Sequence, residues 1–226
     1  MITIIPARSN SKRIPNKNIK DLFGKPVIAY PIDTAFKAGS KEVLVLTDSK
    51  YIGRVAREYK AEIPYYRSSQ TSDDHATTYD VIKEFYDRCP QYGNEIIVLM
   101  YPCSALITPD ILKSAYEKFR EDYYYGANSM YTVCKYPHPI QRAFNIHSNR
   151  LKYNDISYMN TRTQDLEDMY YDTGSFYIFH LQSVIDNKSL FTNNTTYYPI
   201  DTQYCCDVDT IHDWYELEKK YLTNNK

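Results

Sequence analysis

Short apolar runs alternate with helix-like segments along most of this chain, and this alternation restricts its fold more than any other feature. Ile2–Ala7 and Glu95–Met100 are two of the runs, and their nearly continuous apolar character is typical of parallel strands buried on both faces. The repeated order of strand and helix predicts an α/β fold, in the form of a three-layer sandwich around a mainly parallel sheet.

The predicted elements follow one another with short connections. The predicted strands are Ile2–Ala7, Glu42–Thr47, Ala61–Tyr66, Glu95–Met100, Ser175–His180 and Tyr197–Ile200. The predicted helices begin at about Pro26, after Ser49, at Thr77 or Thr78, at Thr108-Pro109 and after Thr210. Residues 136–172 have two prolines, no helical period and only a weak hairpin pattern around Ser148-Asn149. We therefore expect a single domain over residues 1–226, with an inserted excursion at 136–172.

Charge is balanced overall but uneven at the start of the chain. The formal net charge of the 226 residues is −1, so we expect neither nucleic acid nor a membrane surface as a partner. No apolar run approaches the roughly 20 residues that span a bilayer. Five cysteines without a C-x-x-C pair favour reduced thiols and a cytoplasmic location. Before Asp21 every charged residue is basic, which predicts a small polyanionic ligand.

The basic residues follow the first predicted strand, where an open α/β sheet binds its ligands. The segment Arg8–Asn18 contains no glycine, which excludes both a P-loop and a dinucleotide fingerprint. Its small polar residues can still turn backbone N–H groups toward a phosphate. A solvated basic turn is the alternative interpretation.

Two further segments contain candidate functional groups. Arg67–Thr78 is rich in Ser, Thr and Asp, and on its own it is equally typical of a loop that ends in a helix cap. Asp207 and Asp209 are two residues apart, so in an extended segment both carboxylates point to one face and can share a hard cation. A capping role before Thr210 is the alternative for this pair.

The run Ile5–Ile19, IPARSNSKRIPNKNI, closely resembles the first motif of the CMP-sialic acid synthetase family, whose members use CTP. Asn10 departs from the glycine expected there. The resemblance implies that Lys12 and Lys17 face the phosphates and act in catalysis with Asp209. It also implies that Asp207 and Asp209 hold Mg²⁺. The nucleotide contacts implied by position are Arg8, Ser11, Lys12, Asn18, Arg67 and Thr78.

The sugar side resembles the pseudaminic acid branch of this family. Tyr101 stands where sialic-acid members have a glutamine, while Gln141-Arg142 and Asp172-Thr173-Gly174 match the branch. The implied sugar contacts are Tyr101, Gln141, Arg142, Arg162 and Asp172, and Arg142 or Arg162 would hold the sugar carboxylate. The implied reaction transfers CMP from CTP to the anomeric hydroxyl of pseudaminic acid, a nine-carbon acidic sugar, with legionaminic or N-acetylneuraminic acid as alternatives. The resemblance further implies a homodimer formed through the excursion at 136–172, with part of one subunit near the sugar site of the other.

Two other functions are compatible with parts of the pattern. A glycosyltransferase can hold a nucleotide-sugar with a D-x-D triplet, but there the triplet usually lies in the middle of the chain, and Asp207 is close to its end. A nucleotide sensor without catalysis is the other alternative, which the presence of both lysines and both aspartates disfavours.

Overall fold

The computed structural model describes residues 1–224, and its centre is a six-stranded sheet of order β10-β6-β9-β5-β1-β4. The strands are β1 (Ile2–Pro6), β4 (Glu42–Leu46), β5 (Ile96–Met100), β6 (Ser129–Lys135), β9 (Tyr170–His180) and β10 (Thr195–Pro199). Only β9 runs antiparallel to its neighbours in this sheet. The predicted mainly parallel α/β sheet is confirmed.

Helices cover both faces of the sheet. They are α1 (Ala29–Lys37), α2 (Lys50–Glu58), α3 (Thr78–Arg88), α4 (Pro109–Tyr124), α5 (Leu181–Asn187) and α6 (Ile211–Asn224). Ile5 points to the face covered by α1, α2 and α4, whereas Ile4 points to the face covered by α3 and α5. This alternation explains why β1 is apolar at successive positions. No helix of residues 1–224 is both long and apolar enough to cross a bilayer.

The helix starts agree with the predicted caps, except at α1. The side chains of Ser49, Thr77 and Thr108 accept backbone N–H groups at the starts of α2, α3 and α4. The first helix begins at Ala29 instead of Pro26, because the chain first forms a short hairpin of β2 (Asp21–Leu22) and β3 (Lys25–Pro26). The prediction missed this hairpin.

The predicted strand Ala61–Tyr66 is wrong as a regular strand. The segment makes only two isolated parallel bridges, from Glu62 to Leu44 of β4 and from Tyr66 to Thr47 directly after β4. Pro64 lies between these bridges and has no N–H to donate, so a continuous ladder cannot form.

A third buried cluster joins the basic loop to the C-terminal helix. Trp214 and Leu217 of α6 are fully buried against Ile14 of the basic loop and Val208 of the Asp207–Asp209 segment. The Lys20 ammonium lies 4.8 Å from the centre of the Trp214 ring. The two segments that hold the candidate site are therefore packed against each other.

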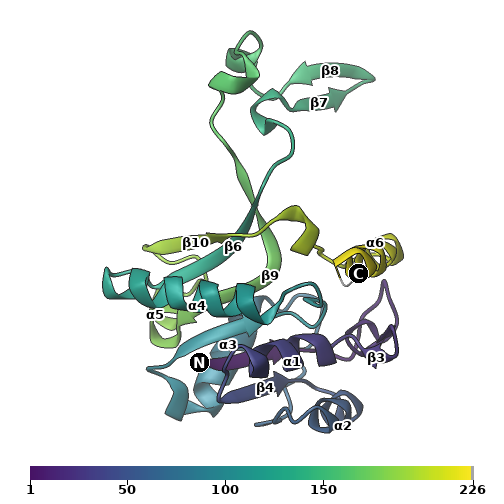
Figure 1. Cartoon of the computed structure of the whole chain (residues 1–226), viewed down its shortest axis with the longest axis vertical. Coiled ribbons are helices and arrows are strands. Elements are labelled where there is room, and N and C mark those ends of the chain that lie inside the picture. Colours follow the sequence, from purple (N-terminus) through teal and green to yellow (C-terminus); the bar gives the residue numbers. More distant parts are fainter. Residues whose placement is uncertain (225–226) are drawn as a thin grey trace.

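Residues 136–169 form an arm that projects away from the sheet and its helices, as Figure 1 shows. The arm contains a hairpin of β7 (Phe144–His147) and β8 (Arg150–Tyr153), whose turn residues Ser148 and Asn149 have φ values of 50° and 60°. The predicted hairpin is confirmed, and its turn is of the kind that suits the twist of two antiparallel strands. The excursion ends earlier than expected, because β9 already pairs with β6 at Tyr170 and runs well before Ser175.

Candidate active site

A cavity of about 690 Å³ lies at the carboxyl edge of the parallel strands. It contains the predicted residues Arg8, Ser11, Lys12, Lys17, Asn18, Arg67, Thr78, Tyr101, Asp172, Asp207 and Asp209. Asp172 belongs to this edge because β9 is antiparallel, so that its first residues lie beyond the end of β5, where Met100 pairs with Phe176. Segments distant in the sequence thus meet in one cavity.

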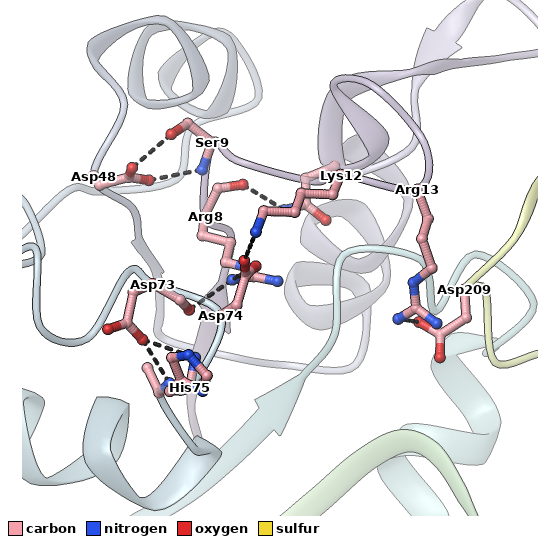
Figure 2. A network of polar contacts seen from close by, with 11 residues as sticks. Arg8, Ser9, Lys12, Arg13, Asp48, Asp73, Asp74, His75 and Asp209 are labelled. Carbon is pink, nitrogen blue, oxygen red and sulfur yellow. Dashed lines mark hydrogen bonds and ion pairs between the residues drawn. The ribbon is translucent and has the colours of Figure 1, made fainter.

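The basic loop after β1 contacts the 67–78 segment through Asp74 (Figure 2). Arg8 Nη1 lies 2.9 Å from Asp74 Oδ1 and also donates to the Asp73 carbonyl at 2.6 Å, and Lys12 forms an ion pair with the same carboxylate. The hydrogen bonds from Lys12 and then Arg8 hold the pKa of the Asp74 carboxyl below its usual range. Asp74 was not predicted as a site residue, although an acidic residue opposite a basic loop was a usable signal.

A second group of cations surrounds Asp209. Arg13 Nη2 lies 2.7 Å and Lys17 Nζ 3.6 Å from Asp209 Oδ1, and Lys17 also donates to the Val208 carbonyl at 2.5 Å. Arg13, which the sequence interpretation did not assign to the site, is therefore part of it. Its place among the basic residues before Asp21 was the available signal.

Asp207 points to the same cavity without a hydrogen-bond or ion-pair partner among residues 1–224. Burial in the cavity wall and then the charge of Asp209 raise the pKa of its carboxyl. Gly174 has a φ of +60° and its missing Cβ would lie 3.8 Å from Asp207 Cγ, so β9 passes close to this carboxylate. The helix cap belongs to Thr210 and Asp213, whose side chains bond each other's backbone, so capping does not explain Asp207 or Asp209.

Two predicted nucleotide contacts differ in what their side chains do. Arg67 is 8% exposed, burial lowers the pKa of its guanidinium, and its Nε has no acceptor among the described residues. Such a buried donor suits an acceptor on a ligand. Asn18 instead donates from Nδ2 to the Arg8 carbonyl at 2.9 Å, so its amide supports the loop.

Part of the cavity wall is aromatic. The Tyr101 and Thr78 hydroxyls lie 2.6 Å apart, and Tyr177 donates to Asp172 Oδ2 at 2.7 Å. Asp172 Oδ1 also accepts the Gly174 N–H at 2.9 Å, so this carboxylate has a defined orientation. Burial raises the pKa of both tyrosine hydroxyls, which keeps them protonated as hydrogen-bond groups. Tyr177 had no role in the sequence interpretation.

Three predicted sugar contacts lie outside the cavity of their own chain. Gln141 donates to the Glu167 carbonyl at 2.8 Å, and Arg142 donates to Thr161 and Thr163. Arg162 forms an ion pair of 2.7 Å with Asp165. All these contacts are internal to the arm.

The α/β sheet, the basic loop at its carboxyl edge and the facing carboxylates define a site of the nucleotidyltransferase type. A CMP-2-keto-3-deoxy-manno-octonic acid synthetase solved with CTP shares this fold, with a TM-score of 0.71 at 17% identity over 98% of both chains.

Sequence comparison gives the family. A family model described as cytidylyltransferase matches residues 2–224. A pseudaminic acid cytidylyltransferase of Campylobacter jejuni is 34% identical, over 100% of this chain and 97% of the relative. A CMP-N,N′-diacetyllegionaminic acid synthase of Legionella pneumophila is 30% identical, over 100% of this chain and 98% of the relative. The chain therefore belongs to the cytidylyltransferase family.

Proposed function

We propose that this protein transfers CMP from CTP to the anomeric hydroxyl of pseudaminic acid. The sugar oxygen attacks the α-phosphorus of CTP, its bond to the phosphorus forms, the bond to pyrophosphate breaks, and the hydroxyl proton is released. The observation that carries the proposal is the single cavity in which the basic loop faces Asp207 and Asp209. The full-length similarity to a pseudaminic acid cytidylyltransferase supports the choice of substrates.

The nucleotide would lie along the basic loop. Arg8, Lys12 and Lys17 would neutralise the triphosphate, and the two lysines would stabilise the charge that develops on the leaving pyrophosphate. Ser11 lies on the same loop and would add a hydroxyl to the phosphates. Arg67 and Thr78 would contact the cytidine from the opposite wall.

A magnesium ion fits the two carboxylates. Oxygen ligands suit Mg²⁺, and Asp207 offers a carboxylate that no cation of the described chain neutralises by a direct contact. Residues 1–224 bring no group of three or more acidic, histidine or cysteine ligands together, so water and phosphate oxygens would complete the coordination. When bound, the ion would supply charge neutralisation at the transferring phosphate.

The sugar would lie against the aromatic part of the cavity wall. Tyr101 gives this wall an apolar ring in place of an amide, which suits the terminal methyl group of pseudaminic acid better than the 9-hydroxyl of N-acetylneuraminic acid. Asp172, oriented by Tyr177, would accept a hydrogen bond from the sugar. Legionaminic acid shares the methyl group and is the closest alternative.

The arm would form a homodimer and reach the sugar site of the partner. It exposes several large apolar side chains, namely Phe144, Ile146, Leu151, Ile156 and Met159. A second copy of this chain would cover them. Gln141, Arg142 and Arg162 would then serve the partner's cavity, with an arginine on the sugar carboxylate. A cytoplasmic location fits these substrates.

The test is pyrophosphate release from CTP with a panel of acidic sugars. We expect turnover that requires Mg²⁺, with clear preference for pseudaminic over N-acetylneuraminic acid. Discrimination against legionaminic acid should be weaker, because legionaminic acid has the same terminal methyl group as pseudaminic acid. Equal or better turnover of N-acetylneuraminic acid would overturn the sugar assignment. A glycosyltransferase would consume a nucleotide-sugar instead of CTP, and a sensor would release no pyrophosphate.

A further inference from the structure

The basic loop must keep its shape without the backbone freedom that phosphate-binding loops usually have. Between Arg8 and Pro15 there is no glycine and no residue with a positive φ, and the first such residue is Asn16 at 54°. Loops that wrap a phosphate usually depend on glycine for this purpose. Contacts from neighbouring segments must therefore define the path of this loop.

Asp48 supplies two of these contacts, both to Ser9, as Figure 2 shows. Its Oδ1 accepts the Ser9 backbone N–H at 2.7 Å and its Oδ2 accepts the Ser9 hydroxyl at 2.6 Å. The sheet dictates this meeting, because β1 and β4 are parallel with Pro6 opposite Leu46, and the Ala7 N–H still bonds the Leu46 carbonyl. Asp48 is thus held beside Ser9 by the strand register.

The Asp48 carboxylate also interacts electrostatically with Arg67, a buried cation of the cavity. The backbone N–H of Arg67 bonds the carbonyl of Thr47, directly before Asp48, at 2.9 Å. Burial lowers the pKa of the Arg67 guanidinium. The negative charge of Asp48 is the largest of the effects that raise this pKa again. Asp48 therefore favours the charged form of a buried arginine while it holds the loop that contains Arg8 and Lys12.

We infer that Asp48 is a positioning residue for the nucleotide. It holds Ser9 so that Arg8 and Lys12 face the phosphates, and it balances the charge of Arg67 on the opposite wall. This role rests on the proposed use of CTP. Asp48 itself is not among the residues that line the cavity, so it would act on the nucleotide only through the residues that it holds.

Three variants separate the loop contact from the charge. Asp48→Ala removes both, Asp48→Asn keeps an acceptor for the Ser9 N–H but removes the charge, and Ser9→Ala keeps the backbone bond alone. The matched control is Asp87→Asn, which removes an exposed carboxylate paired with Lys83 on α3. Thermal unfolding of each variant identifies any that do not fold, in which case the remaining variants decide.

We expect Asp48→Ala to raise the KM for CTP by about 10- to 100-fold, the scale of a misplaced binding group, with a smaller change in kcat. Asp48→Asn and Ser9→Ala should each show an intermediate effect, and Asp87→Asn none. Calorimetric titration with inorganic tripolyphosphate and Mg²⁺ should show the same order of affinities. Because tripolyphosphate binding needs neither the base nor the sugar, this order would persist even if the protein did not make a CMP-sugar. Folded Asp48→Ala protein with unchanged KM and tripolyphosphate affinity, or with kcat alone reduced, would overturn the inference.

Discussion

At the scale of single residues, the cations of the cavity share two carboxylates. Arg8 and Lys12 contact Asp74, and Arg13 and Lys17 contact Asp209. These side chains are partly exposed to solvent, which screens the ion pairs and leaves them little weight in the stability of the fold. A polyphosphate with several charges can therefore compete for the same cations at little cost to the fold.

Asp209→Ala should abolish Mg²⁺-dependent turnover while the chain stays folded. Removal of a metal ligand takes away charge stabilisation in the transition state, which is typically worth several kcal/mol. Pyrophosphate release measures the loss, and circular dichroism with thermal unfolding checks the fold. Near-normal turnover of this variant and of Asp207→Ala would contradict the metal site.

Lys12→Ala should lower kcat/KM for CTP by about 100-fold or more, as expected for one preorganised electrostatic group. Lys50→Ala is a suitable control, because Lys50 is exposed at the start of α2 and does not line the cavity. If the loop were only a solvated basic turn, both variants would behave like the unaltered protein.

At the scale of elements, the cap of α3 connects stability to pH. The Asp80 carboxylate accepts the backbone N–H and the hydroxyl of Thr77, and these hydrogen bonds lower the pKa of Asp80. A folded-state pKa below the unfolded value means that the contribution to stability is present at neutral pH. It is lost as the pH falls through the lowered pKa.

Asp80→Asn should therefore reduce the free energy of unfolding at pH 7 by about 1 kcal/mol or less, the scale of a charge at a helix N-terminus. The difference from the unaltered chain should stay constant down to about pH 4 and shrink below it, since the ordinary pKa of aspartate is about 3.9. Urea denaturation at several pH values measures it, with Asp87→Asn as the control on the same helix. A difference that is the same at pH 3 and pH 7 would argue against the linkage.

Trp214→Ala should destabilise the chain by about 3–5 kcal/mol, because a fully buried indole is lost from the cluster that includes Val208. Tyr215→Ala is the matched control, since Tyr215 is the next residue of α6 and is 59% exposed. Chemical denaturation measures both. Equal effects of the two variants would show that α6 does not depend on this cluster.

The elements also show what could be predicted from the sequence. β1, β4 and β5 are apolar at successive positions because both faces are buried, and this pattern is visible without a structure. β6 was missed, because its buried positions include Ser129 and Thr132, whose hydroxyls are satisfied by side-chain hydrogen bonds. The start of β9 was missed because exposed polar and aromatic residues there continue the pairing with β6.

Those residues of the candidate site that follow from the local sequence pattern were predicted. Those that depend on which distant segments the fold brings together were missed. The loop after β1 and the Asp207–Asp209 pair follow from strand ends and spacing. The roles of Asp74 and Tyr177 require knowing which segments face each other across the cavity. Arg142 was expected near the sugar, but the arm takes it away from its own cavity, which no local pattern reveals.

At the scale of the whole molecule, the arm should determine the oligomeric state. Replacement of residues 136–169 by a short turn should give a monomer without turnover, since the exposed apolar side chains and the arm arginines are lost together. Light scattering at micromolar concentration measures the mass. A variant with Ile146 and Leu151 both changed to serine keeps the arm and its arginines, and it should weaken the dimer. An unaltered chain that is monomeric at this concentration would contradict the proposal.

The arm leaves the sheet at Lys135 and returns at Tyr170, and these two residues are direct partners in the ladder between β6 and β9. The whole arm is therefore a long hairpin connection between β6 and β9, and its two ends lie side by side in the sheet. The length and sequence of the arm can therefore change without a change in the pairing of the strands that form the cavity. In evolution or in protein engineering, this junction can accept a different insert while the strands around the cavity keep their pairing.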